Sequence, residues 1–212
     1  MKKHLVNINT AFVLGNGQSR LNLDTPKLLP LGTVYGCNAL YREMEPHVLV
    51  CVDVKMVNEV IASGYHRTHE VWTNPNKGIT NKANLNFFNP HKGWSSGPTA
   101  LWFASQQSFK EIYIFGFDYQ GVEGKFNNVY ADTFNYKRSH DPATFFGNWL
   151  NQTEKVIKEF NHIRFFRVIE PKTFIPDKLQ NISNLEHITY DMFEQKFRGC
   201  TYTTENLQKT TI

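Results

Sequence analysis

Short runs of Val, Ile, Leu and Phe alternate along the chain with longer segments in which apolar residues recur every three or four positions. The short runs predict strands and the longer segments predict helices, and this alternation is typical of βαβ units around a mostly parallel sheet. Several runs are apolar at consecutive positions, which favours strands buried on both faces. We expect strands at Ala11–Leu14, Thr33–Cys37, Val48–Val52, Glu70–Thr73, Leu85–Phe88, Ile112–Phe115 and Ile163–Ile169.

The helical segments carry start and stop signals. Asp141 can cap a helix whose first residue is Pro142, and Gly64 can end the helix that begins after Asp53. The predicted fold class is therefore α/β: a Rossmann-like, mostly parallel sheet with helices on both faces and a lid segment. The expected helices are Val54–Ser63, Pro98–Ser108, Pro142–Phe160 and Tyr190–Phe197.

Composition narrows the class of protein. Apolar residues make up 41% of the chain and aromatic residues 14%, which is enough to exclude a mostly disordered chain. No run of 18 apolar residues occurs, so we expect no membrane-spanning segment, and we expect no signal peptide. Three widely spaced cysteines, Cys37, Cys51 and Cys200, favour reduced thiols and a cytoplasmic location. The net charge of +4 is compatible with an anionic ligand such as a nucleotide.

The first predicted strand runs directly into Gly15-Asn16-Gly17-Gln18-Ser19. Glycines at a strand end let the backbone turn tightly and approach a phosphate group. No Gly-Lys-Ser/Thr follows, which excludes a P-loop. Arg20 replaces the third glycine of a dinucleotide fingerprint, and the second strand ends without an acidic residue, so NAD binding is disfavoured. A purely structural glycine turn stays open.

Other polar residues also follow predicted strands or open predicted helices, at the edge where open α/β sheets bind ligands. The Asn38 amide can donate to a phosphate oxygen and accept from a sugar hydroxyl, or it can stabilise a turn. Asp53 can contact a ligand or cap the following helix, and Asp118 can contact a ligand or order its own loop. We predict that these segments converge at one sheet edge: Gly15–Ser19, Asn38, Ser96–Gly97 and Asp118.

The segment 119–141 is long for a loop and rich in aromatic residues, which favours a lid. We expect it to fold over the sheet edge and to be less ordered without a ligand. His140 can act as a general base because imidazole titrates near neutral pH, although a loop histidine is often merely exposed. The spacing of His, Cys and acidic residues predicts no metal site.

Taken in order, four segments resemble bacterial sialyltransferases of the Campylobacter lipooligosaccharide type, with a wider similarity to archaeal pterin diphosphokinase-like proteins. The segments are Gly15–Ser19, Cys37–Tyr41, Ser96–Gly97 and Lys110–Asp118, and the resemblance covers about residues 11–119. Gln18 stands where that family usually has proline. The resemblance implies a Rossmann-like sheet with a lid and a CMP-sugar donor, which is a co-substrate and not a resident cofactor.

The resemblance also implies site residues. Donor contacts fall on Gly15, Asn16, Gly17, Ser19, Asn38, Ser96, Gly97 and Asp118. In the family, two lid tyrosines assist the leaving phosphate and a histidine acts as base. By position, Tyr130 matches one tyrosine, Tyr119 or Tyr136 is the candidate for the other, and His140 matches the base.

The predicted function is a metal-independent glycosyltransferase that moves a sugar from a nucleotide sugar to a hydroxyl acceptor, either a glycan or a hydroxylated base in DNA. Two alternatives stay open: a diphosphokinase-like phosphotransferase, which needs Mg²⁺ and clustered carboxylates, and a non-catalytic nucleotide-binding module. We expect residues 1–170 to form the nucleotide-binding domain, with the lid at about 119–141. Residues 171–212 are expected to pack on it as an extension that is loosely ordered from Cys200 to Ile212.

Overall fold

The computed structural model describes residues 9–198, which form one eight-stranded sheet. All neighbouring strands are parallel, and the strand order is β5-β4-β3-β2-β1-β6-β7-β8. The predicted Rossmann-like α/β class is confirmed, and the sheet is all-parallel. The strands are β1 Thr10–Leu14, β2 Thr33–Cys37, β3 Val48–Val50, β4 Val71–Thr73, β5 Asn86–Phe87, β6 Glu111–Phe115, β7 Arg164–Ile169 and β8 Leu185–Thr189.

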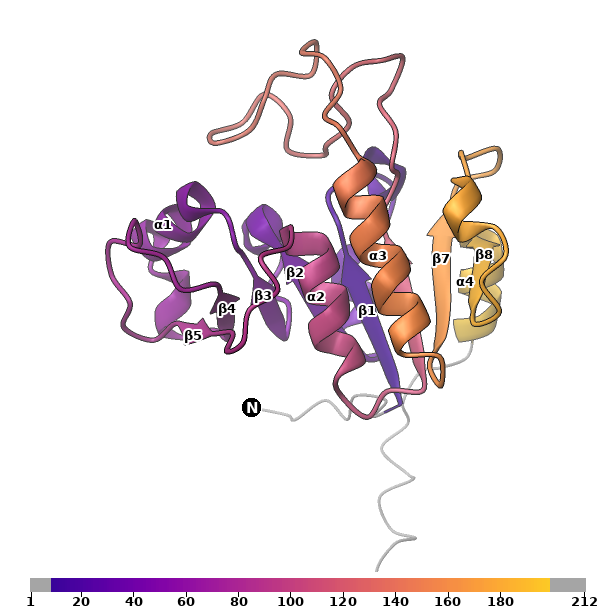
Figure 1. The fold of residues 1–212 in the computed structure, drawn as a ribbon, viewed down its shortest axis with the longest axis horizontal. Coiled ribbons are helices and arrows are strands. Elements are labelled where there is room, and N and C mark those ends of the chain that lie inside the picture. Colours follow the sequence, from indigo (N-terminus) through magenta and orange to yellow (C-terminus); the bar gives the residue numbers. More distant parts are fainter. Residues whose placement is uncertain (1–8, 199–212) are drawn as a thin grey trace, which may run out of the picture.

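Helices cover both faces of the sheet (Figure 1). Helices α2 (Ser96–Ser105) and α3 (Gly147–Glu159) pack on one face, and α1 (Val54–Ser63) and α4 (Tyr190–Phe197) on the other. In β1, Phe12 and Leu14 pack on the α4 side while Ala11 and Val13 pack on the α2 side. Because successive side chains point to opposite faces, burial of both faces explains the unbroken apolar run. Short 3₁₀ helices complete the chain: η1 Gln18–Arg20, η2 Thr25–Leu28, η3 Asn38–Arg42, η4 Tyr65–Arg67 and η5 Asp177–Leu179.

One predicted helix start is wrong, and the bounds of a second helix shift by two or three residues. Helix α2 begins at Ser96, two residues before Pro98, and it ends at Ser105. Helix α3 begins at Gly147 and not at Pro142. Pro142 instead forms an antiparallel bridge with Lys125, and the Asp141 carboxylate accepts a hydrogen bond from the Arg138 amide in the preceding turn. Because Pro142 pairs with Lys125 of the lid, the helix cannot start there. Gly64 does end α1, in the left-handed conformation with φ 78°.

The segment after residue 170 contributes to the sheet itself. Strand β8 pairs with β7 along its whole length and was not among the predicted strands. It lies at the sheet edge, and of its five residues only Ile188 is fully buried, so its sequence lacks a strong apolar run. Helix α4 has the predicted bounds, and its Phe193 packs against Phe12 of β1. The predicted loose end, Cys200–Ile212, lies outside the described residues.

The chain order places β1 at a topological switch point. From β1 the sheet grows through β2 to β5 in one direction and through β6 to β8 in the other. The connections after β1 and β6 therefore diverge at the carboxyl edge of the sheet, which is where open α/β sheets bind ligands. The segment 119–141, the lid, rises above this edge and extends toward α1 (Figure 1). No helix in the described part, residues 9–198, is long and apolar enough to cross a membrane.

Candidate functional site

A cavity of about 820 Å³ lies at the carboxyl edge of the sheet, beside the switch point. Its volume falls within the usual range for small-molecule sites. The cavity is lined by the loops after β1, β2, β3, β4 and β6, by the start of α2 and by the lid. The structure brings together these residues predicted from the sequence: Gly15, Asn16, Gly17, Asn38, Ser96, Gly97 and Asp118. The lining does not include Ser19, Tyr130 or His140.

The two glycines after β1 allow this loop to lie against the loop after β6. The Gly15 amide donates to the Phe115 carbonyl and the Gly17 amide to the Gly116 carbonyl, each at 2.8 Å. A Cβ atom on Gly15 would lie 2.6 Å from the Gly116 carbonyl oxygen, and one on Gly17 would lie 2.4 Å from the Asp118 carboxyl carbon. Close packing of the two loops at the switch point therefore requires glycine at both positions, independently of any contact with a ligand.

Asp118 ties the glycine loop to the lid. Its carboxylate accepts hydrogen bonds from the Ser19 hydroxyl, from the Ser19 amide at 3.0 Å and from the Asn127 side chain at 3.0 Å. Asn127 in turn accepts from the Gln18 amide at 2.8 Å. These contacts support the interpretation that Asp118 and Ser19 order the loops. Direct contact of either side chain with a nucleotide stays a prediction.

Asn38 and Ser96 join three elements at the cavity wall. The Ser96 hydroxyl donates to the Asn38 side-chain oxygen at 2.7 Å and accepts from the Val52 amide at 3.0 Å. Asn38 has φ 53°, a left-handed conformation that asparagine tolerates better than most residues. The hydroxyl therefore fixes the end of β2, the end of β3 and the start of α2 relative to one another.

Two amide oxygens in the cavity lining have no partner in the part of the chain that the structure describes. They are Asn16 Oδ1 and Asn74 Oδ1, and both atoms are buried. The Asn16 Nδ2 group donates to the Tyr136 hydroxyl at 3.3 Å. A buried acceptor without a donor costs about 1–3 kcal/mol. Because Asn16 and Asn74 line the cavity, their two oxygens are the candidate acceptors for hydroxyl or amino groups of a ligand.

The rest of the lining combines positive charge with aromatic surface. Exposed lysines face the cavity from two sides: Lys55 from α1 and Lys137 from the lid. Aromatic side chains form another part of the wall: Trp94, Phe117, Tyr119, Phe126, Tyr136, Phe146 and Trp149. This lining suits a ligand that has an anionic group, hydroxyl groups and a flat ring.

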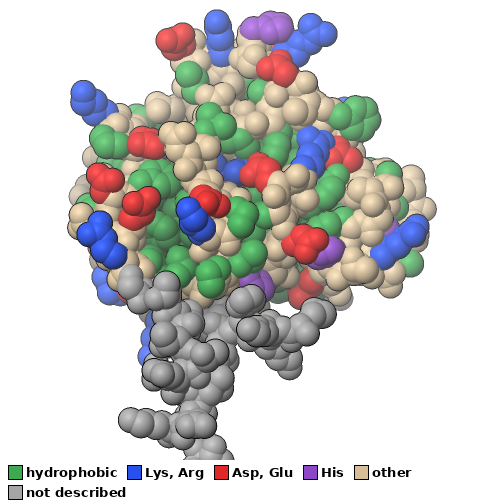
Figure 2. Space-filling view, turned by 180° about the vertical axis from the view of Figure 1, so that it is seen from behind, with side chains coloured by type: hydrophobic (Ala, Val, Ile, Leu, Met, Phe, Trp, Pro, Cys, Tyr) green, Lys and Arg blue, Asp and Glu red, His purple; other side chains and the backbone are tan. Residues whose placement is uncertain are grey.

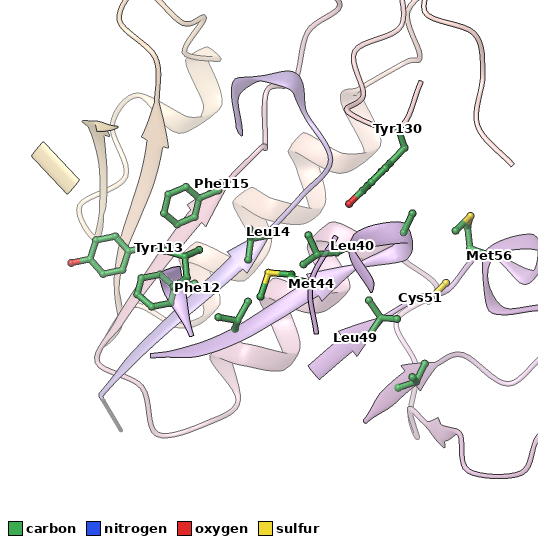
Figure 3. Packing of buried hydrophobic residues seen from close by; sticks show 14 of the residues in the cluster. Phe12, Leu14, Leu40, Met44, Leu49, Cys51, Met56, Tyr113, Phe115 and Tyr130 are labelled. Carbon is green, nitrogen blue, oxygen red and sulfur yellow. The ribbon is translucent and has the colours of Figure 1, made fainter. Parts of the chain in front are cut away.

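Tyr130 belongs to the lid but does not line the cavity. Its ring points from the lid toward Leu40 in the apolar core (Figure 3). Its hydroxyl accepts a hydrogen bond from Arg20 at 2.9 Å, and burial raises the pKa of Tyr130 well above its ordinary value. Arg20 also donates to the Gly15 carbonyl at 2.6 Å and pairs with Glu43 at 3.0 Å. The geometry makes Tyr130 an anchor of the lid, while Tyr119 and Tyr136 line the cavity.

His140 is exposed at the outer side of the lid. It lines a separate hollow of about 240 Å³ that has Phe126 in common with the main cavity. Charged side chains and a histidine gather at the top of the molecule in Figure 2. The structure does not bring His140 into the cavity, and its role as a base stays a prediction.

The cavity contains residues that the sequence did not single out. Asn74 directly follows β4, just as Asn38 follows β2, so the strand-end rule used for Asn38 would also have found it. Lys137 and Asn127 were missed because their positions depend on the path of the lid, which no periodicity predicts. Residues 9–198 contain no group of three His, Cys, Asp or Glu side chains arranged to hold a metal ion.

The fold and the cavity define a class: a Rossmann-like α/β protein with a ligand cavity at its switch point. No protein-family model and no curated protein matches the sequence.

Proposed function

We propose that this chain is a glycosyltransferase that moves a sugar from a nucleotide-sugar donor to a hydroxyl acceptor. The observation that carries the proposal is the meeting of four separate segments in one cavity at the switch point. These segments are Gly15–Gly17, Asn38, Ser96–Gly97 and Asp118. Their order along the chain is the one that resembles CMP-sugar-dependent sialyltransferases, so a CMP-sugar is the favoured donor.

The chemistry of the cavity fits such a donor. Lys55 and Lys137 supply positive charge for the phosphate, and the amides at the start of α2 favour an anion. The unpartnered oxygens of Asn16 and Asn74 accept from ribose or sugar hydroxyls. The aromatic side chains provide surfaces for a base. Since all these groups face one space, they can bind the parts of one ligand at the same time.

In the proposed reaction the acceptor oxygen attacks the anomeric carbon and the bond from that carbon to the phosphate breaks. The electron pair leaves with the phosphate, where the lysines stabilise the charge without a metal ion. A base takes the acceptor proton, and the resemblance assigns that role to His140. The Asp118 oxygens already accept three hydrogen bonds, which weighs against a Mg²⁺-binding role in the diphosphokinase-like alternative. The buried free thiols of Cys37 and Cys51 suit a cytoplasmic enzyme.

A turnover assay with a matched variant tests the proposal. CMP-, UDP- and GDP-sugars are each incubated with the chain and an acceptor, and the released nucleotide is measured. We expect release with one class of donor and a loss of at least tenfold in kcat/KM in the double variant Lys55→Ala, Lys137→Ala. The control Lys110→Ala removes an exposed lysine next to the start of β6, at the opposite sheet edge, and should keep its activity. If nucleotides bind but no nucleotide is released from any donor, glycosyl transfer is rejected and the non-catalytic nucleotide-binding module remains.

The acceptor is tested separately, because a glycan and a hydroxylated DNA base differ in charge. DNA binding that depends on phosphate contacts weakens steeply between 50 and 200 mM salt. Negligible binding of the chain to DNA at every salt concentration would reject the DNA acceptor and leave the glycan.

A further inference from the structure

We propose that the Asp53 carboxylate is the general base that takes the proton of the acceptor hydroxyl. This assignment rests on the proposed glycosyl transfer and adds a residue to it. Asp53 follows β3 and lines the same cavity as Asn16, Asn38 and Ser96.

The side chain of Asp53 is free for this role. Asp53 occupies the N-cap position of α1, yet its carboxylate makes no capping hydrogen bond. Only its backbone carbonyl accepts a helix bond, from the Val57 amide at 2.9 Å. Throughout residues 9–198 the Asp53 carboxylate has neither a hydrogen bond nor an ion pair. An N-cap aspartate usually bonds to its helix, a contact worth about 1 kcal/mol, so an unbound one facing a cavity suggests a different use.

The other ionisable groups in the cavity lining are poor bases. The Cys37 thiol donates to a backbone carbonyl at 2.8 Å, and burial raises the pKa of Cys37 to about 12. Burial also raises the pKa of Tyr119 and Tyr136, so both hydroxyls keep their protons. Asp118 already accepts three hydrogen bonds. The side chains of Lys55 and Lys137 are hydrogen-bond donors and provide no acceptor for a proton.

Hydrogen bonds of the neighbouring residue fix the position of Asp53 relative to the predicted donor-binding residues. The preceding residue, Val52, donates its amide to the Ser96 hydroxyl at 3.0 Å, and that hydroxyl donates to Asn38 at 2.7 Å. Asp53 is therefore one residue from a hydrogen-bonded cluster that faces the donor. His140 lies in a separate hollow and would need the lid to move, whereas Asp53 already faces the cavity.

The step is balanced. The acceptor O–H bond breaks and its proton passes to an Asp53 oxygen. The acceptor oxygen forms a bond to the anomeric carbon while the bond from that carbon to phosphate breaks, and the nucleotide leaves with the electron pair. Asp53 then returns the proton to water, and no oxidant or metal ion is required.

The experiment compares Asp53→Asn and Asp53→Ala with the wild-type chain and with two further variants. Asp191→Asn is the matched control, because Asp191 is also an exposed acid at a helix start, in the first turn of α4. His140→Ala tests the competing base. The donors are CMP-N-acetylneuraminic acid, UDP-glucose and GDP-mannose, each with lactose or with an oligonucleotide containing 5-hydroxymethylcytosine. Nucleotide release gives kcat, and calorimetry with CMP, UDP and GDP gives the Kd.

We expect both Asp53 variants to lose at least 100-fold in kcat while their nucleotide Kd stays within about twofold of wild type. Sodium formate should restore part of the rate to Asp53→Ala, which a merely structural role would not allow. Asp191→Asn should behave like wild type. Asp53 variants that keep their kcat, with His140→Ala inactive, overturn the assignment and leave the proposed function intact. A wild-type chain that turns over none of these pairs overturns both.

Discussion

At the scale of single residues, the loop after β1 requires glycine because it has no room for a Cβ atom. Gly17 has φ −65°, a backbone conformation open to any residue. Its difficulty is space, because a Cβ atom there would lie 2.4–2.6 Å from three atoms of the Asp118 carboxyl group. Gly64 is the opposite case, with φ 78° and nothing within 4 Å of an added Cβ. Substitution of Gly17 therefore measures a steric cost, and substitution of Gly64 measures the cost of the left-handed backbone conformation.

Gly17→Ala should destabilise the fold by about 1–3 kcal/mol, because Asp118 must move and lose bonds to Ser19 or Asn127. Gly64→Ala should cost about 1–2 kcal/mol through the left-handed backbone alone. Urea unfolding gives both values. Only Gly17→Ala should also change the near-ultraviolet circular dichroism of the cavity aromatics. Unchanged stability in Gly17→Ala would contradict the packing account.

The second prediction at the scale of single residues concerns Arg20. It is buried and donates to the Gly15 carbonyl, the Glu43 carboxylate and the Tyr130 hydroxyl, so it joins three segments. Arg20→Ala removes the guanidinium donor from all three acceptors and should cost about 3–5 kcal/mol in unfolding free energy. The control Lys158→Ala removes the half-exposed pair with Glu154 and should cost at most about 0.5 kcal/mol. Equal losses in chemical denaturation would contradict a special role for Arg20.

At the scale of elements, the lid is fastened at its tip as well as at its base. Arg42 at the end of η3 donates to the Thr133 hydroxyl at 2.9 Å and to the Phe134 carbonyl at 3.0 Å. Asn135 donates to Glu59 of α1 at 2.8 Å, and Glu59 also pairs with Arg42. These contacts connect the lid to η3 and α1, which also contribute residues to the cavity lining. Opening the lid tip therefore requires breaking them together.

Acid should loosen this fastening. Burial raises the pKa of Glu59, but hydrogen bonds from Tyr41, Arg42 and Asn135 outweigh burial, and the pKa lies below its ordinary value. A carboxylate with a lowered pKa stabilises the docked lid above its ordinary pKa, and that stabilisation is lost as the pH falls through the lowered value. We expect hydrogen exchange in 133–137, corrected for intrinsic rates, to speed up on acidification below about pH 4.5. Glu59→Gln should exchange fast at pH 7 and gain little more in acid.

The elements also show what the sequence could predict. The central strands were predictable because their apolar runs are buried on both faces of the sheet. Helix α1 was predictable because Met56, Val57 and Val60 recur at helical spacing on its one buried face and because Gly64 ends it. Residues just past those strand ends, such as Asn38, were predictable from the topology alone. Strand β8 was missed because an edge strand needs fewer apolar residues. The start of α3 was wrong because Pro142 pairs with Lys125 in the lid, a tertiary contact that no local signal reveals.

At the scale of the whole molecule, one edge of the sheet brings together polar side chains from residues far apart in the sequence. Ser19 bonds to Asp118, 99 positions away, and Asn16 bonds to Tyr136, 120 positions away. These contacts hold the cavity in place before a ligand arrives. A ligand that binds the folded chain and not the unfolded chain stabilises the whole domain.

A nucleotide should therefore raise the melting temperature of the chain. At a ligand concentration of 100 Kd the stabilisation is about 2.7 kcal/mol, which corresponds to roughly 5–10 °C for a domain of this size. A cytidine nucleotide should give the largest shift in a panel of CMP, UMP, GMP and AMP. Asn74→Ala removes one unpartnered acceptor from the cavity and should reduce the shift at fixed CMP concentration. Asn161→Ala, an exposed residue just before β7 at the opposite edge, should leave the shift unchanged. Equal shifts for all four nucleotides would reject a preference for cytidine, and no shift with any of them would reject nucleotide binding in this cavity.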